Sequence, residues 1–159
     1  MGDHVSFEGY TCYIIAGCAM TTFSCMEPVK KANDVVFAAA FMKIQLRFGF
    51  CLTLVLDKDS KLYSTFRETS NLLTMNTHTL GGENHNPTIV KRTNRYLNKS
   101  MKIFCQERGT VKVAAEGILM ALCAWNSVPI PGTDLSRSLV LLGREFYFPI
   151  DLSAQNISN

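Results

Sequence analysis

The chain has 159 residues, of which 47% are hydrophobic and 18% are charged, and its formal net charge is +3. This length suits one ordinary domain with a sizeable core, and this composition excludes a disordered or low-complexity protein. The positive charge is concentrated, because residues 88–112 hold seven Lys and Arg residues against a single acid, Glu107. Such a segment is typical of a surface that contacts a polyanion, although a merely solvated helix face gives the same pattern.

The first third of the chain predicts two strands, a helix and a third strand. Residues 10–18 and 22–29 are short and β-rich, which favours an antiparallel pair. Asn33 is a suitable N-cap for the helix that follows, and Gly49 closes it. Its apolar residues recur at steps of three and four, namely Phe37, Phe41, Ile44 and Phe48. The uncharged run that starts at Cys51 and ends in Asp57 predicts a strand of a parallel sheet, buried on both faces.

The remainder of the chain predicts mainly helices. A helix is expected over 61–73, a short strand over 75–80, and a loop over 81–87, which contains two glycines and a proline. A long helix follows Pro87 with an apolar inner stripe and a basic outer side, and an apolar helix is expected over 111–125. The stretch 139–150 is mixed apolar and aromatic, and a polar tail covers 153–159.

This order of elements predicts an α/β or α+β domain over residues 1–152, with a mixed sheet and helices on its faces. The sheet is expected to begin antiparallel and to become parallel. The six cysteines include no Cys-x-x-Cys pair, which favours reduced thiols packed in the core of an intracellular protein of the nucleus or cytoplasm. The apolar run 11–23 is too short and interrupted for a membrane span, so no membrane contact is expected.

Two runs of residues resemble the catalytic core of retrotransposon integrases. Val55-Leu56-Asp57-Lys58-Asp59-Ser60 is similar to the motif that surrounds the family's second catalytic aspartate. The run from His85 to Asn98, which contains Lys91-Arg92-Thr93-Asn94-Arg95-Tyr96-Leu97, is similar to the family's helix of the form Glu-Arg-x-Asn-Arg-x-Leu. The resemblance covers most of the chain and implies a ribonuclease-H-like fold, from which the first strand is missing here.

The resemblance also implies a metal-dependent phosphoryl transfer for which three carboxylates hold two Mg²⁺ or Mn²⁺ ions. Asp57 matches the second of these acids and is the predicted catalytic residue and metal ligand, although an aspartate in a turn at a strand end is the plain alternative. Lys91 stands where the family has its glutamate, and an ammonium group cannot coordinate Mg²⁺. Glu83, in the preceding loop, is the nearest substitute. The first acid is either imitated by Asp3 or lies upstream.

The basic helix supplies the predicted contact with DNA. Lys91, Arg95, Asn98 and Lys102 follow one another at steps of four, three and four, so they share a helix face. The family uses the corresponding face to grip DNA phosphates, and such contacts are salt-dependent and largely independent of sequence.

The predicted function is therefore that of a degenerate, retroelement-derived integrase core, a pseudoenzyme that binds DNA without integrating it. One alternative is a non-catalytic DNA-binding or multimerisation module, which forms a homo-oligomer through the apolar segment 111–125. Another is an active integrase fragment that upstream sequence completes. Loss of a central strand would also expose a sheet edge, which predicts poor solubility.

Overall fold

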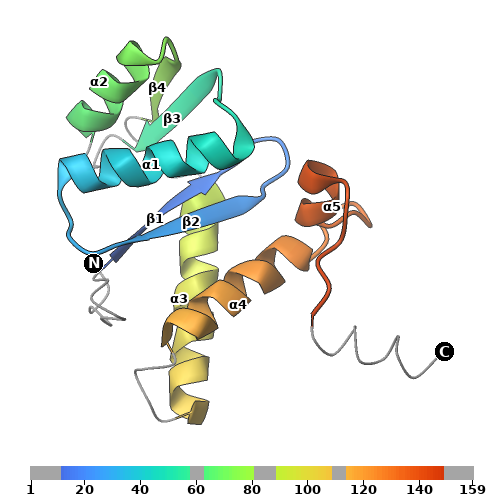
Figure 1. The fold of residues 1–159 in the computed structure, drawn as a ribbon. Helices are drawn as coiled ribbons and strands as arrows, with labels where there is room; N and C mark the ends of the chain where they lie inside the picture. The colour runs from blue at the N-terminus through green and yellow to red at the C-terminus, as the bar shows by residue number, and fades with distance from the viewer. Residues whose placement is uncertain (1–11, 58–62, 81–88, 109–113, 149–159) are drawn as a thin grey trace.

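The computed structural model describes residues 12–57, 63–80, 89–108 and 114–148 (Figure 1). Five helices and four strands occur in these ranges, in the order β1 (Cys12–Gly17), β2 (Ser24–Val29), α1 (Asp34–Phe48), β3 (Thr53–Asp57), α2 (Tyr63–Leu72), β4 (Asn76–Leu80), α3 (Ile89–Arg108), α4 (Ala114–Ser127) and α5 (Arg137–Leu142). The predicted order is confirmed as far as α4. The predicted end of the domain at residue 152 lies outside the described residues and stays a prediction. None of the helices that the structure describes is long and apolar enough to cross a membrane.

β1 and β2 form an antiparallel hairpin, with register from Cys12 opposite Val29 to Gly17 opposite Ser24. The turn is closed by two backbone hydrogen bonds of 2.9 Å, in which Cys18 donates to Phe23 and Thr22 donates to Cys18. Thr22 has a φ of 55°, a left-handed conformation that is uncommon for a β-branched residue.

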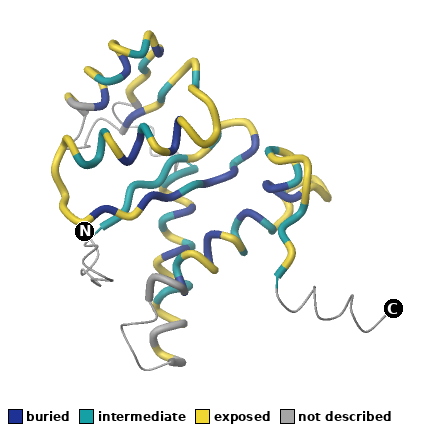
Figure 2. Tube along the Cα trace, viewed as in Figure 1, coloured by how far each residue is buried: buried dark blue, intermediate teal, exposed yellow. Residues whose placement is uncertain are grey.

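α1 begins and ends as its sequence predicts. The side-chain oxygen of Asn33 accepts a hydrogen bond from the backbone N–H of Val36, and Gly49 ends the helix with a φ of 87°. Ala40, Phe41 and Ile44 are buried on its inner face. Figure 2 shows this alternation of buried and exposed turns along the helix.

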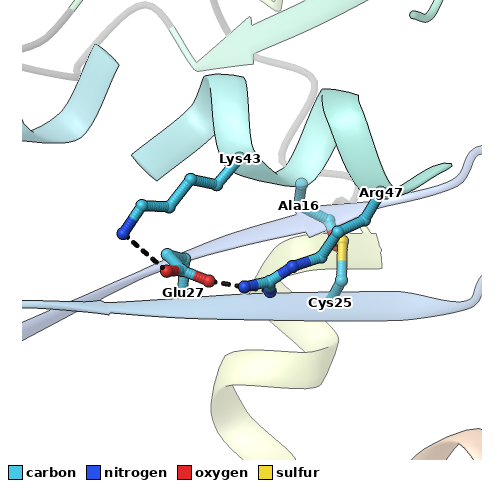
Figure 3. Close-up of polar contacts among 5 residues, drawn as sticks. All are labelled: Ala16, Cys25, Glu27, Lys43 and Arg47. Atoms are coloured by element: carbon cyan, nitrogen blue, oxygen red, sulfur yellow. Dashed lines mark hydrogen bonds and ion pairs between the residues drawn. The ribbon is translucent and has the colours of Figure 1, made fainter. Parts of the chain in front are cut away.

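A buried glutamate on the hairpin joins β2 to α1 through two ion pairs. Glu27 points toward α1, where it accepts from Lys43 Nζ at 3.2 Å and from Arg47 Nη1 at 2.8 Å (Figure 3). Its side chain is only 9% exposed, whereas both cations reach solvent. Two partners compensate the cost of removing this carboxylate from water, so the ion pairs set how α1 lies on the hairpin.

β3 and β4 form a second sheet, in which the strands run parallel and α2 makes the crossover between them. The prediction of one continuous mixed sheet is therefore wrong for the described residues, which form two sheets of two strands each. The prediction that the strand ending at Asp57 is buried on both faces is also wrong. Leu56 is buried, but Leu52 is 85% exposed and Val55 is 49% exposed, because the packed helices cover one face of β3.

The two sheets share a core beneath α1. Phe41 of α1, Leu56 of β3 and Phe66 of α2 are buried together with Met75, and the rings of Phe41 and Phe66 meet edge to face at 5.3 Å. Ile14 of β1 packs against the same cluster. α1 consequently lies against both sheets, as its central place in Figure 1 shows.

The opposite face of the hairpin is covered by α3 and α4. Met26 of β2 is buried with Leu97 of α3 and with Leu122 of α4, and Tyr13 and Ile15 pack against them. Helices therefore cover both faces of the hairpin sheet, as predicted.

α5 is the element that the sequence did not predict. The stretch 139–150 carried no assigned structure, yet a helix begins at Arg137. Ser136 caps it by accepting from the backbone N–H of Leu139, and Gly143 ends it with a φ of 71°. A serine before an apolar run and a glycine after it are ordinary helix boundaries, so the signal was present in the sequence.

Four of the cysteines, Cys12, Cys18, Cys25 and Cys51, are half-buried, and Cys123 is exposed. The prediction that most of them pack within the core is therefore wrong for these five, which lie at its margin. Burial raises the pKa of the Cys25 thiol to about 11, despite the nearby charge of Arg47.

Candidate nucleic-acid interface

The basic face of α3 is organised by what the helix buries on its other side. Thr93 and Leu97, one turn apart, are completely buried against the hairpin and α4. In an α-helix, residues that lie three and four positions apart share a face, so burying this pair turns the opposite face outward.

That outward face gathers the predicted DNA contacts. Lys91, Arg95, Asn98 and Lys102 are all exposed, as is Lys99 beside them. A surface depression is lined by Lys91, Asn94, Arg95, Asn98, Lys99 and Lys102. The structure thus brings together the four nucleic-acid-binding residues that the sequence predicts, and it adds Asn94 and Lys99. We call these six residues the basic face.

The basic face carries four cations and two amides, and it contains no acid. Among the residues that the structure describes, Arg95, Lys99 and Lys102 form no ion pair, since both of the ion pairs found involve Glu27 on the other side of the hairpin. Arg95, Lys99 and Lys102 can therefore bind an external anion. Amide side chains between them can donate hydrogen bonds to phosphate oxygens, as Asn and Gln do at nucleic-acid surfaces.

A buried polar network holds α3 in place. The Ser24 hydroxyl of β2 lies 2.9 Å from the hydroxyl of Thr93, which also donates to the carbonyl of Ile89 at 3.0 Å. The side chain of Asn126 on α4 bonds the backbone of Ser24 through both of its polar atoms. Three elements distant in sequence meet at this point, which fixes the start of α3.

The sequence does not reveal this network, because Ser, Thr and Asn are most often surface residues and nothing local marks them as buried. The only available signal was the position of Thr93 within the apolar stripe of the helix.

The structure describes the predicted catalytic residues only in part. Asp57 is the last residue of β3 and Lys91 lies in the first turn of α3, but the side chain of Asp57 is outside the described residues. Asp3 and the substitute acid Glu83 also lie outside the described residues, as does His85. Their roles remain predictions.

The described residues do not fit a divalent metal. No group of three His, Cys, Asp or Glu side chains within them is close enough to hold a metal ion. Lys91 is exposed, and a protonated amine offers no lone pair to Mg²⁺ or Mn²⁺. An ammonium group near such a site would instead repel the cation.

The fold is shared with the catalytic cores of retroviral integrases. The HTLV-2 integrase core in complex with magnesium, in a trimeric form, matches with a TM-score of 0.66 and 16% identity, over 87% of this chain and 90% of that chain. Its dimeric form matches with a TM-score of 0.62 and 16% identity over 84% and 86%. The BIV integrase core matches with a TM-score of 0.60 and 16% identity over 92% and 90%.

No family model and no curated protein matches the chain. Identity this low shows the fold alone, which is ribonuclease-H-like. The fold predicted from the resemblance is thereby confirmed.

Proposed function

We propose that this chain is a retroelement-derived, integrase-like core that binds DNA through the basic face of α3 and does not catalyse integration. The observation that carries the proposal is the basic face itself, which presents four cations and no acid on one side of a single helix. The ribonuclease-H-like fold supports it, since the HTLV-2 and BIV integrase cores share this fold.

The geometry of α3 suits a phosphate backbone. An α-helix rises about 1.5 Å per residue, so Lys91 and Lys102 lie about 16 Å apart along the axis. Duplex DNA carries one negative charge per about 1.7 Å of its own axis, so several phosphates lie within reach of a face of that length. Such contacts neutralise charge and release counterions, and they do not read base sequence.

The proposed lack of catalysis follows from the lysine at position 91. Two-metal phosphoryl transfer needs oxygen ligands to bring both cations to the reacting phosphate. A lysine at the position of the family's glutamate contributes a positive charge in place of a ligand, which favours binding of the phosphate backbone and disfavours binding of Mg²⁺. Lys91 therefore contributes to DNA affinity and also accounts for the loss of activity.

The proposal is tested by fluorescence anisotropy with a labelled duplex of about 25 base pairs, titrated between about 50 and 200 mM salt. The variant Arg95→Gln/Lys99→Gln/Lys102→Gln removes three charges from the basic face. We expect weaker binding and a salt dependence that is shallower by about 0.9 in log–log slope per lost contact. The matched control, Lys31→Gln/Arg67→Gln/Arg144→Gln, removes three exposed charges elsewhere. Equal losses in both variants would refute a specific DNA-binding role of α3.

A second candidate function is self-association through α4. Leu119 and Met120 are 51% and 57% exposed in the middle of this helix, which is more apolar surface than a solvated helix needs. Sedimentation velocity tests this: Leu119→Ser/Met120→Ser should convert an oligomer to a monomer, while DNA binding at saturating concentration stays intact. A wild-type monomer at all concentrations would eliminate this candidate.

A further inference from the structure

Two amide side chains of the basic face make no hydrogen bond within the part of the chain that the structure describes. Asn94 is half-buried and Asn98 is exposed, and both line the same depression as the four cations. Each amide keeps a carbonyl oxygen that can accept and an amino group that can donate. Both groups are therefore available to an external ligand.

The two amides lie together on one flank of the basic face. An α-helix has about 3.6 residues per turn and rises about 1.5 Å per residue, so Asn94 and Asn98 are one turn and about 6 Å apart along the axis. Arg92 and Lys99 are also exposed, and they fall on the opposite flank. One flank of α3 is thus cationic, and the other carries two uncharged groups of the same kind.

The chemistry of an amide suits the edge of a base better than it suits a phosphate. Phosphate oxygens only accept hydrogen bonds, so an amide bound to a phosphate uses its donor and not its acceptor. The major-groove edge of adenine presents the N6 donor beside the N7 acceptor, and an asparagine side chain pairs with both at once. The cations of the basic face already supply attraction to phosphates. The amides can therefore add recognition of a base.

The outer side of α3 is open enough for such a contact. Every residue that lines the depression belongs to α3, so no other described element closes it. An α-helix with its side chains is about 10–12 Å across, and the major groove of B-DNA is about 12 Å wide. The helix can therefore enter the groove while its cationic flank stays close to the phosphates.

We propose that Asn94 and Asn98 bind adenine edges in the major groove of duplex DNA, while the cations of the basic face hold the phosphates. This inference rests on the proposed DNA binding by α3 and adds a sequence preference to it. Adjacent base pairs are about 3.4 Å apart along the duplex axis, so amides about 6 Å apart can contact bases one or two steps apart. The preferred sites consequently contain two closely spaced adenines.

The test compares two duplexes of about 25 base pairs with closely spaced adenines. In the second duplex every adenine is replaced by 7-deazaadenine, which keeps base pairing and charge but has a C–H group in place of the N7 acceptor. In anisotropy titrations of the full chain, the second duplex should bind about fivefold more weakly or worse. The variant Asn94→Ala/Asn98→Ala should bind both duplexes equally and keep the wild-type salt dependence, because it removes no charge.

The matched control, Asn71→Ala/Asn76→Ala, removes two exposed amides elsewhere and should keep the preference for natural adenine. Equal binding of both duplexes by the wild type, with its salt dependence intact, would overturn the inference and leave the proposed DNA binding standing. A preference that persists in Asn94→Ala/Asn98→Ala would also overturn it, because other residues would then read the base. Absence of binding to either duplex would refute the proposed function as well.

Discussion

Asn126 pairs with the backbone of Ser24 as a neighbouring strand would. Its Oδ1 accepts from the Ser24 N–H at 3.0 Å and its Nδ2 donates to the Ser24 carbonyl at 2.8 Å, with both residues almost fully buried. The end of α4 is thus joined to the edge of β2 by two hydrogen bonds. One side chain closes the sheet edge and also fixes the helix that packs behind α3.

Replacement of Asn126 by alanine should destabilise the fold, because it leaves the backbone donor and acceptor of Ser24 buried without hydrogen-bond partners. Each such group costs about 1 to 3 kcal/mol, so we expect the free energy of unfolding to fall by about 3 kcal/mol. Urea denaturation followed by circular dichroism measures it. Asn71→Ala, at an exposed site on α2, should change stability by less than about 0.5 kcal/mol. Similar effects of the two variants would contradict this role for Asn126.

Arg137 should anchor α5 through several contacts at once. Its Nε donates to Thr22 at 2.9 Å, its Nη1 donates to the carbonyls of Trp125 and Val128, and its guanidinium lies 4.2 Å from the centre of the Trp125 ring. Arg137→Leu should lower the free energy of unfolding by about 3 kcal/mol, since it removes the ring contact and leaves two part-buried carbonyls without their donor.

The chain has a single tryptophan, so intrinsic fluorescence reports directly on this contact. The emission of Trp125 should shift in Arg137→Leu and stay unchanged in Arg144→Leu, which alters an exposed arginine. An unaltered spectrum in the first variant would show that the stacking is absent in solution.

The Cys25 thiol should make stability fall at alkaline pH. Burial raises its pKa to about 11 in the folded state, against 9.0 for a thiol exposed to water. Below pH 9 the thiol is protonated in both states and the contribution is fully present. As the pH rises from 9 to 11 only the unfolded state releases the proton, so about 2 to 3 kcal/mol is lost. Cys25→Ala should flatten this part of the pH profile in urea titrations, and an unchanged profile would disprove the assignment.

Restoring a carboxylate at position 91 should restore weak metal binding. Calorimetric titration with Mn²⁺ should give no heat for the wild type and a weak signal for Lys91→Glu, because the chain would then carry two of the three acids that the resemblance implies, at positions 57 and 91. Asp57→Asn should remove that signal in the double variant. If the wild type binds Mn²⁺ and Asp57→Asn abolishes it, a substitute ligand exists and the proposed lack of catalysis is wrong.

Local signals were enough to predict most of the elements. The Asn33 cap and the spacing of Phe41 and Ile44 gave α1, and the residues around Asn94 gave α3 together with its exposed cations. These signals act over one or two helical turns, and tertiary packing agrees with them here.

The features that the sequence did not predict depend on residues that lie far away in the chain. The uncharged run from Cys51 predicts burial on both faces of the strand. Val55 is nevertheless exposed, because burial depends on which strands lie beside β3. No local pattern in the sequence encodes the neighbours of a strand. Burial of Ser24, Thr93 and Asn126 likewise arises because three distant segments supply one another's hydrogen bonds.

The place of α1 between the two sheets has a consequence for how the protein opens. β3, α2 and β4 contact the rest of the described structure mainly through the apolar side of α1 and through Ile14. A group of elements that contacts the rest of a protein through one interface can unfold locally, at a lower free energy than global unfolding requires. We therefore expect β3, α2 and β4 to open as a separate cooperative unit, while the hairpin, α3 and α4 stay folded around their buried polar network.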